Sequence, residues 1–401
     1  MIKPINILYF TYFIYLLCIL GIKSTGNMIL NYGFNITLIL AVIFSLPSIT
    51  LFKNRNIGNL WFLFLFLLII TFSSLIFKSS FYNVLFILKM IIFYLFLKYY
   101  KIDENKFIKF INNTYFIYIF ISVLIFVFYP SLVYEIKGKE NNMIDLYFLQ
   151  YTMLHSIEGS AASLDTYSAI ILFLNVIVNK SKEKRKFFIV LSAIILLWTF
   201  RLTPLISIIL AYIAYKIIKK GKHAFLFLSF ITLFFILILI INHKNTTVFG
   251  IPTYLLLYQL THARSMIWDQ QLIYMFENYD FLDYVFGNFS SESFRVNSFQ
   301  IDGREKNDLI DNPHNNYLLL FFRNPLFFVV IFVQFLYNIY KKFDKKWFPI
   351  IVLIFIGGFT NSQLLSLQNP IYFLILIYFF SNYNTNHEKE KHKSRIYSSR
   401  I

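Results

Sequence analysis

The stretch FFIVLSAIILLWTFRLTPLISIILAYIAYKII, residues 187–218, decides the fold class of this chain. Its apolar run is broken only at Arg201-Leu202-Thr203-Pro204. A helix that crosses a bilayer needs about 20 mainly apolar residues, and shorter runs are tolerated. Because proline fits the first turn of a helix, the break predicts a tight turn. The stretch therefore predicts two consecutive membrane helices, 187–203 and 204–218.

Similar apolar runs fill most of the chain. Hydrophobic residues make up 58% of its 401 residues and charged residues only 14%, whereas soluble domains are nearer half apolar and a quarter charged. The predicted fold is an all-α, polytopic membrane helix bundle in a single transmembrane domain, 1–381, followed by a polar tail, 382–401. About 12 spans are expected: 5–22, 34–52, 59–77, 82–97, 110–129, 164–179, 187–203, 204–218, 224–242, 317–340, 348–364 and 367–381.

The basic residues predict how these spans are oriented. Lysine and arginine are retained on the cytoplasmic side of a membrane. With the N-terminus inside, the predicted inner segments hold 25 of the 37 basic residues, namely Lys3 and those in 53–55, 98–109, 180–186, 216–222, 341–346 and 389–400. The net charge of +17 then reflects topology and contact with anionic lipid, so no nucleic acid partner is expected.

Two long segments, 130–163 and 242–316, fall on the outer, periplasmic side. Long loops inside a compact fold are commonly functional or disordered. The second segment is not of low complexity, and Thr261–Glu277 has the apolar spacing of a short helix that lies on the bundle. It ends in Asp311-Asn312-Pro313-His314-Asn315-Asn316. A site at this boundary between water and lipid is the first functional hypothesis.

Several kinds of chemistry are excluded by the residue pattern. The chain has no glycine-rich phosphate loop and no nucleophile elbow. Its single cysteine, Cys18, allows no disulfide within the chain. The histidines lack metal-ligand spacing with carboxylates on one helix face. We therefore expect neither a metal ion nor a cofactor.

Three segments carry a resemblance to a known family. They are Leu197-Trp198-Thr199-Phe200-Arg201, then Ala263-Arg264-Ser265-Met266-Ile267-Trp268, and finally Pro313-His314-Asn315-Asn316-Tyr317-Leu318. Their order and spacing resemble the O-antigen polymerase and ligase superfamily over about residues 110–381. Two departures are Phe200, where the family often has serine, and Arg323-Asn324-Pro325, where it usually has a glycine-containing turn.

The resemblance implies glycosyl transfer on the periplasmic face of a bacterial inner membrane. The donor would be an oligosaccharide on undecaprenyl diphosphate, and the partners would be membrane lipids and a chain-length regulator protein. Arg201 and Arg264 would bind the diphosphate, since guanidinium groups pair with phosphate through a planar fork of donors, and Arg323 would assist. His314 would be the general base for the acceptor hydroxyl. The expected acceptor-side residues are Asn315, His155 and Glu158.

Alternatives remain open at this point. Within the family, a ligase would transfer the glycan to lipid A–core instead of to a lipid-linked repeat unit. From another class, a flippase would also have about twelve spans, but it would place charges inside the bundle and keep its loops short. Singly, Arg201 can be an interfacial anchor, Arg264 a partner of Asp269 or Glu277, and His314 a turn residue.

Overall fold

A computed structural model gives the fold of the chain. The residues that it describes are 4–25, 36, 39, 92–93, 95–97, 100, 102–128, 143–146, 149–152, 154, 161–179, 184–199, 202–243, 247–248, 251–252, 264–286, 300–301, 304–305, 315–323, 325–360, 371–372 and 374–380. The spans predicted at 34–52, 59–77 and most of 82–97 lie outside them, as does the polar tail.

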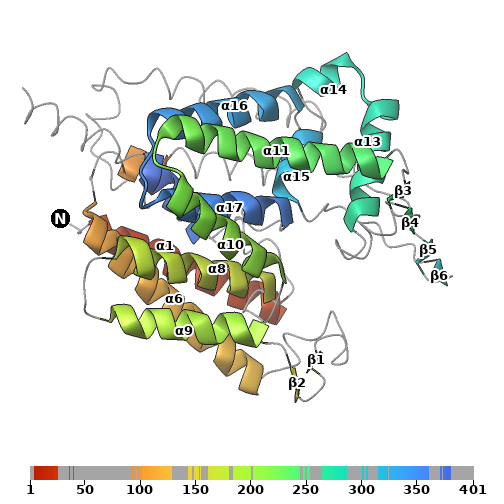
Figure 1. Ribbon diagram of the computed structural model, residues 1–401. Helices are drawn as coiled ribbons and strands as arrows, with labels where there is room; N and C mark the ends of the chain where they lie inside the picture. The colour runs from red at the N-terminus through yellow and green to blue at the C-terminus, as the bar shows by residue number, and fades with distance from the viewer. Residues whose placement is uncertain are drawn as a thin grey trace, which may run out of the picture.

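Long helices running side by side form a bundle (Figure 1). They are α1 (Pro4–Thr25), α6 (Glu104–Phe128), α8 (Ala161–Phe173) with a π-helical continuation (Leu174–Val178), α9 (Arg185–Thr199), α10 (Leu202–Ile217), α11 (Gly221–His243), α16 (Pro325–Lys341) and α17 (Phe348–Thr360). The prediction of a helical bundle is confirmed for these residues. The division predicted at Arg201–Pro204 is present as two helices, but α9 ends at Thr199 and α10 already begins at Leu202, so Pro204 lies in the first turn of α10. Residues 200 and 201 themselves lie outside the described residues.

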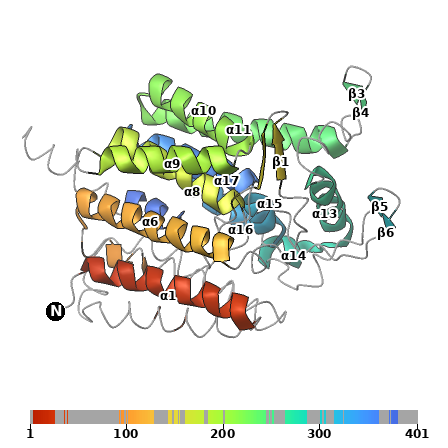
Figure 2. The same ribbon diagram turned by 90° about the horizontal axis from the view of Figure 1, so that it is seen from below.

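Short elements gather at one end of this bundle, on the right in Figures 1 and 2. They are the antiparallel hairpins β1–β2 (Met143–Leu146, Leu149–Thr152), β3–β4 (Thr247–Val248, Ile251–Pro252) and β5–β6 (Gln300–Ile301, Arg304–Glu305), and the helices α13 (Arg264–Asn278) and α14 (Phe281–Phe286). All of them belong to the two long polar segments, 130–163 and 242–316. The sequence predicted α13 but neither α14 nor any of the hairpins.

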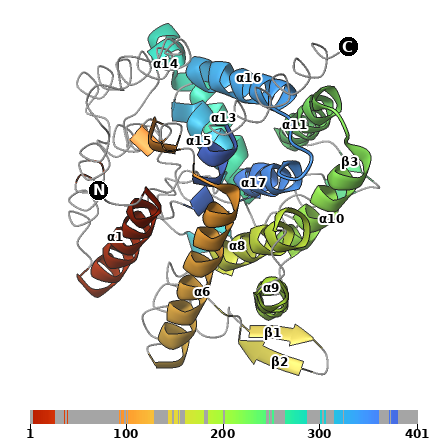
Figure 3. The same cartoon turned by 90° about the vertical axis from the view of Figure 1, so that its left-hand side faces the viewer.

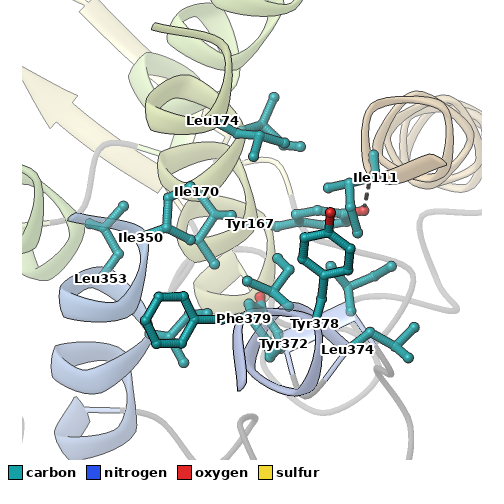
Figure 4. Packing of buried hydrophobic residues seen from close by; sticks show 14 of the residues in the cluster. Ile111, Tyr167, Ile170, Leu174, Ile350, Leu353, Tyr372, Leu374, Tyr378 and Phe379 are labelled. Carbon is teal, nitrogen blue, oxygen red and sulfur yellow. Dashed lines mark hydrogen bonds between the residues drawn. The ribbon is translucent and has the colours of Figure 1, made fainter. Parts of the chain in front are cut away.

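The core lies around α8, which packs against α6, α17 and the helical residues 371–372 and 374–380 (Figure 4). Several buried polar groups inside it are paired with one another, which offsets the cost of removing them from water. The Tyr167 hydroxyl of α8 lies 3.0 Å from the Thr114 hydroxyl of α6 and donates to the Ile111 carbonyl at 3.3 Å. The Tyr115 hydroxyl lies 2.7 Å from that of Ser168. These pairs fix the register of α6 against α8.

A second polar group holds the other end of α8. Asn112 and Asn175 exchange amide hydrogen bonds at 3.0 and 2.8 Å. The Asn175 carbonyl also accepts from Arg185 Nε at 2.7 Å, and the Val176 carbonyl accepts from Arg185 Nη2 at 2.8 Å. A π-turn widens a helix and rearranges its carbonyls. Arg185 therefore provides donors for two carbonyls of that turn and ties α9 to α8.

The prediction of one span over 317–340 is wrong. The chain forms two helices there, α15 (Asn316–Arg323) and α16, which begins at Pro325. Proline has no N–H, and its ring clashes with the preceding turn, so it starts a helix better than it continues one. The hydroxyl of Tyr279 in α13 donates to the Phe322 carbonyl at 2.6 Å. That bond satisfies one of the carbonyls at the end of α15.

Gly357 and Gly358 lie inside a continuous helix, α17, within the span predicted at 348–364. Gly358 is needed because the Tyr317 ring lies against it, and an added Cβ would stand 2.6 Å from Tyr317 Cε2. The Tyr317 hydroxyl donates to the Phe355 carbonyl at 3.0 Å. Seen from the end of the bundle, α17 lies between α10 and α15 (Figure 3).

Within the described residues, two helices, Glu104–Phe128 and Gly221–Ile241, are long and apolar enough to cross a membrane. Shorter apolar helices are Pro4–Leu17, Leu164–Val178, Pro204–Ile217, Phe328–Lys341 and Phe348–Phe359. The total of twelve spans remains a prediction.

Candidate functional site

The helix predicted at Thr261–Glu277 is α13, and it lies against α15. Trp268, Met275 and Tyr279 stand on one face of α13 by helical spacing. They are buried in a cluster with Leu318 and Phe322 of α15 and Leu239 of α11. The long polar segment is therefore anchored on the bundle through an apolar contact.

The two helices run in the same direction. At their first turns an aromatic chain joins them: the Phe235 ring of α11 lies 5.4 Å from Trp268 and 4.5 Å from Phe359, whose ring is 4.5 Å from Tyr317. At their last turns the Tyr279 hydroxyl donates to the Phe322 carbonyl. We call this contact the α13–α15 seam, defined by Trp268, Gln271 and Met275 of α13 with Tyr279 directly after it, and by Asn315 with the α15 residues up to Phe322.

Asn315, predicted on the acceptor side, is the N-cap of α15. Its Oδ1 accepts from the backbone N–H of Tyr317 at 3.0 Å and of Leu318 at 3.1 Å. Such a cap satisfies donors that the first turn of a helix leaves unpaired. Asn315 is fully buried, and its Nδ2 has no hydrogen-bond partner in the part of the chain that the structure describes. The Oδ1 of Asn315 thus caps the helix, and its Nδ2 is available to donate to another group.

Arg264 is the first residue of α13. At 100° per residue, position 264 shares the helix face of Trp268 and Gln271, which is the face turned to α15. Arg323 is the last residue of α15, so it lies about 12 Å along the helix axis from Asn315. The structure therefore brings position 264 to the seam and puts Arg323 at the far end of α15 from the cap.

Arg201, His314, His155 and Glu158 lie outside the described residues, and only their neighbours are placed. Arg201 falls between the end of α9 and the start of α10. Helix α10 packs on α17, and α17 packs on α15. His314 directly precedes the cap of α15.

The carboxylates of Asp280 and Asp283 cap the start of α14, the helix that follows α13. The Asp283 N–H donates to Asp280 Oδ1 at 2.8 Å, and the Asp280 N–H donates to Asp283 Oδ2 at 3.3 Å. This reciprocal arrangement is a capping box at the start of α14. Burial raises the pKa of the Asp283 carboxyl; the Asp280 N–H lowers it, and the Asp280 charge raises it. The pair has a structural task and needs no catalytic one.

Gln271 was missed by the sequence reading. Its side chain is 3% exposed, and neither its Oε1 nor its Nε2 has a partner among the described residues. The only sequence feature that could have indicated Gln271 is its position between Trp268 and Met275 on one helix face. That feature becomes informative only once this face is known to be buried. Asp165 of α8 is buried as well, and its Oδ1 accepts from the Thr166 hydroxyl at 3.2 Å.

Among the described residues, no group of three histidine, cysteine, aspartate or glutamate side chains could hold a metal ion. None of the known protein families matches the chain, and neither a curated protein nor a solved structure does. The resemblance given above therefore rests on the three motif segments.

Proposed function

We propose that the protein is a metal-independent glycosyltransferase of the inner membrane, an O-antigen polymerase that works on its periplasmic face. The observation that supports this best is the α13–α15 seam. The helix that opens with Arg264 packs beside the helix whose cap, Asn315, follows His314. Two motif segments that lie about fifty residues apart in the sequence thus meet at one place.

The reaction suits these residues. A hydroxyl of the acceptor sugar attacks C1 of the donor sugar, a new C–O bond forms, and the bond from C1 to the diphosphate oxygen breaks. His314 accepts the hydroxyl proton. Undecaprenyl diphosphate leaves with the bonding electron pair, and Arg201 and Arg264 stabilise its charge. The acceptor would be the terminal sugar of a single lipid-linked repeat unit.

The outer surface of the bundle supports a membrane location. Large apolar side chains on α11 are more than half exposed, including Phe230 (67%) and Leu233 (64%), and so is Leu197 on α9 (65%). A soluble monomer rarely exposes so wide an apolar surface, whereas lipid covers it at no cost. Together with the asymmetry of basic residues, this surface favours a chain embedded in lipid.

The deciding experiment is the surface glycan profile of a strain lacking the gene. A polymerase predicts lipid A–core capped with one repeat unit. Uncapped core with polymer accumulating on the carrier would instead indicate the ligase. Loss of all periplasmic repeat units would indicate the flippase, and an unchanged profile would reject all three.

A further inference from the structure

The α13–α15 seam buries amide groups that no hydrogen bond within the described part of the chain satisfies. Gln271 and the Nδ2 of Asn315 have no hydrogen-bond partner among the described residues. A buried amide without a partner costs free energy that an apolar side chain of similar size would avoid. Packing alone would therefore favour leucine at position 271. The presence of an amide there instead indicates that a ligand forms hydrogen bonds with it.

Both residues lie at the same level of the seam. Gln271 is eight residues before Tyr279, and Asn315 is seven residues before Phe322, the two residues joined by a hydrogen bond. In parallel helices these separations correspond to about 12 and 10 Å from that bond. Gln271 shares its face with Trp268 and Met275, which are buried in one cluster with Leu318 and Phe322 of α15 and with Leu239 of α11. The two amides thus border one stretch of the interface, close to the segment that carries His314.

The chemistry of the two amides selects the ligand. Gln271 has one group that accepts and one that donates, and Asn315 adds a donor. A diphosphate only accepts, so it would leave the Gln271 Oε1 unpaired. Sugar hydroxyl and acetamido groups donate as well as accept, and they would satisfy all of these atoms. A site built on such bonds discriminates strongly against sugars that lack the group.

We infer that the α13–α15 seam is a sugar subsite in which Gln271 and Asn315 bind a hydroxyl or acetamido group of the lipid-linked repeat unit and set the sugar specificity. This inference rests on the proposed function. Gln271 is then a specificity residue, whereas the Oδ1 of Asn315 keeps its capping role.

The test uses the full-length protein in nanodiscs and two probes, the undecaprenyl-diphosphate-linked repeat unit of the producing strain and undecaprenyl diphosphate without sugar. The rise in melting temperature is titrated against each probe. Gln271→Leu is compared with Gln270→Leu, the same change 100° round the same helix. Asn315→Asp is the second variant, because aspartate keeps the cap and removes the Nδ2 donor.

We expect Gln271→Leu without ligand to melt no lower than wild type. Its half-saturation for the repeat unit should rise at least about tenfold, equivalent to 1.4 kcal/mol, with the response to undecaprenyl diphosphate unchanged. Asn315→Asp should lose affinity for the repeat unit likewise, although its buried carboxylate will also lower the melting temperature. Gln270→Leu should bind both probes like wild type. Equal loss of both probes in Gln271→Leu would assign the amides to the diphosphate and overturn the inference. A lower melting temperature without a change in binding would reduce Gln271 to a structural residue.

Failure of the proposed function looks different. If wild type responds to neither probe and makes no polymer, the glycosyltransferase assignment falls, and the subsite with it. If wild type polymerises and Gln271→Leu does so with unchanged half-saturation, only the subsite is rejected.

Discussion

At the scale of single residues, Gly358 shows how a side chain on one helix dictates the residue on another. The Tyr317 ring lies against α17 at this glycine and is held by the bond to the Phe355 carbonyl. Gly358→Ala should therefore cost about 1–3 kcal/mol of stability through overpacking. Gly357→Ala is the matched control, because its Cβ would meet only Thr166 Cγ2 at 3.5 Å. Thermal unfolding in detergent measures both, and equal melting temperatures would disprove the proposed contact.

The arginines are tested by their geometry as well as their charge. If Arg201 and Arg264 each make charge-assisted bonds to the donor diphosphate, loss of either should cost about 1.5–3 kcal/mol, or roughly 10- to 150-fold in activity. Lysine should rescue poorly, because it lacks the fork of donors. The measurement is polymer length and rate at equal protein levels. Normal glycan chains from both alanine variants would remove the arginines from the mechanism.

At this scale the sequence selects a candidate residue only where a motif marks it. His314, Arg201 and Arg264 were selected in that way, and the structure adds that position 264 faces the seam. Gln271 could not be predicted, because its importance depends on which face of α13 is buried and on the absence of a hydrogen-bond partner for its amide among the described residues. Asn315 was selected for substrate contact, yet half of its side chain is used as a helix cap.

At the scale of elements, one hydrogen bond ties α13 to the bundle where α15 ends. Tyr279→Phe would leave the Phe322 carbonyl without this donor, and a buried unpaired carbonyl costs about 1–3 kcal/mol. We expect a lower melting temperature and reduced transfer, because α13 carries Arg264. Tyr284→Phe is the control, since its hydroxyl makes a longer bond of 3.2 Å to Met275 in a partly exposed place. If both variants melt together with wild type, the bond does not fasten the seam.

Helices with a clear apolar pattern were predicted to within a few residues, and α13 is an example. The division at Pro325 was missed because the apolar run continues across it, and hydropathy does not register the missing N–H. The hairpins were missed because strands of two to four residues show no reliable alternation. These errors concern how the chain turns, which local pattern specifies weakly.

At the scale of the whole molecule, orientation decides whether the site can meet its substrates. The basic residues predict that both termini and Lys180–Lys186 face the cytoplasm and that 242–316 faces the periplasm. A single cysteine introduced at Asn297, in a variant with Cys18→Ser, should react with a membrane-impermeant maleimide added to whole spheroplasts. Protection until the cells are lysed would place the segment inside and reject the periplasmic site.

The central claim is that His314 is the base of a glycosyl transfer. The most direct measurement is polymerisation of purified lipid-linked repeat units by wild type and by His314→Ala at equal protein levels. The account predicts a loss of about 10²–10⁴-fold with donor-induced stabilisation retained, a wild-type rate that falls on acidification because imidazolium cannot accept a proton, and no effect of a chelator. A variant that keeps more than about a tenth of the wild-type rate would lie outside the range of a general base and would contradict the account.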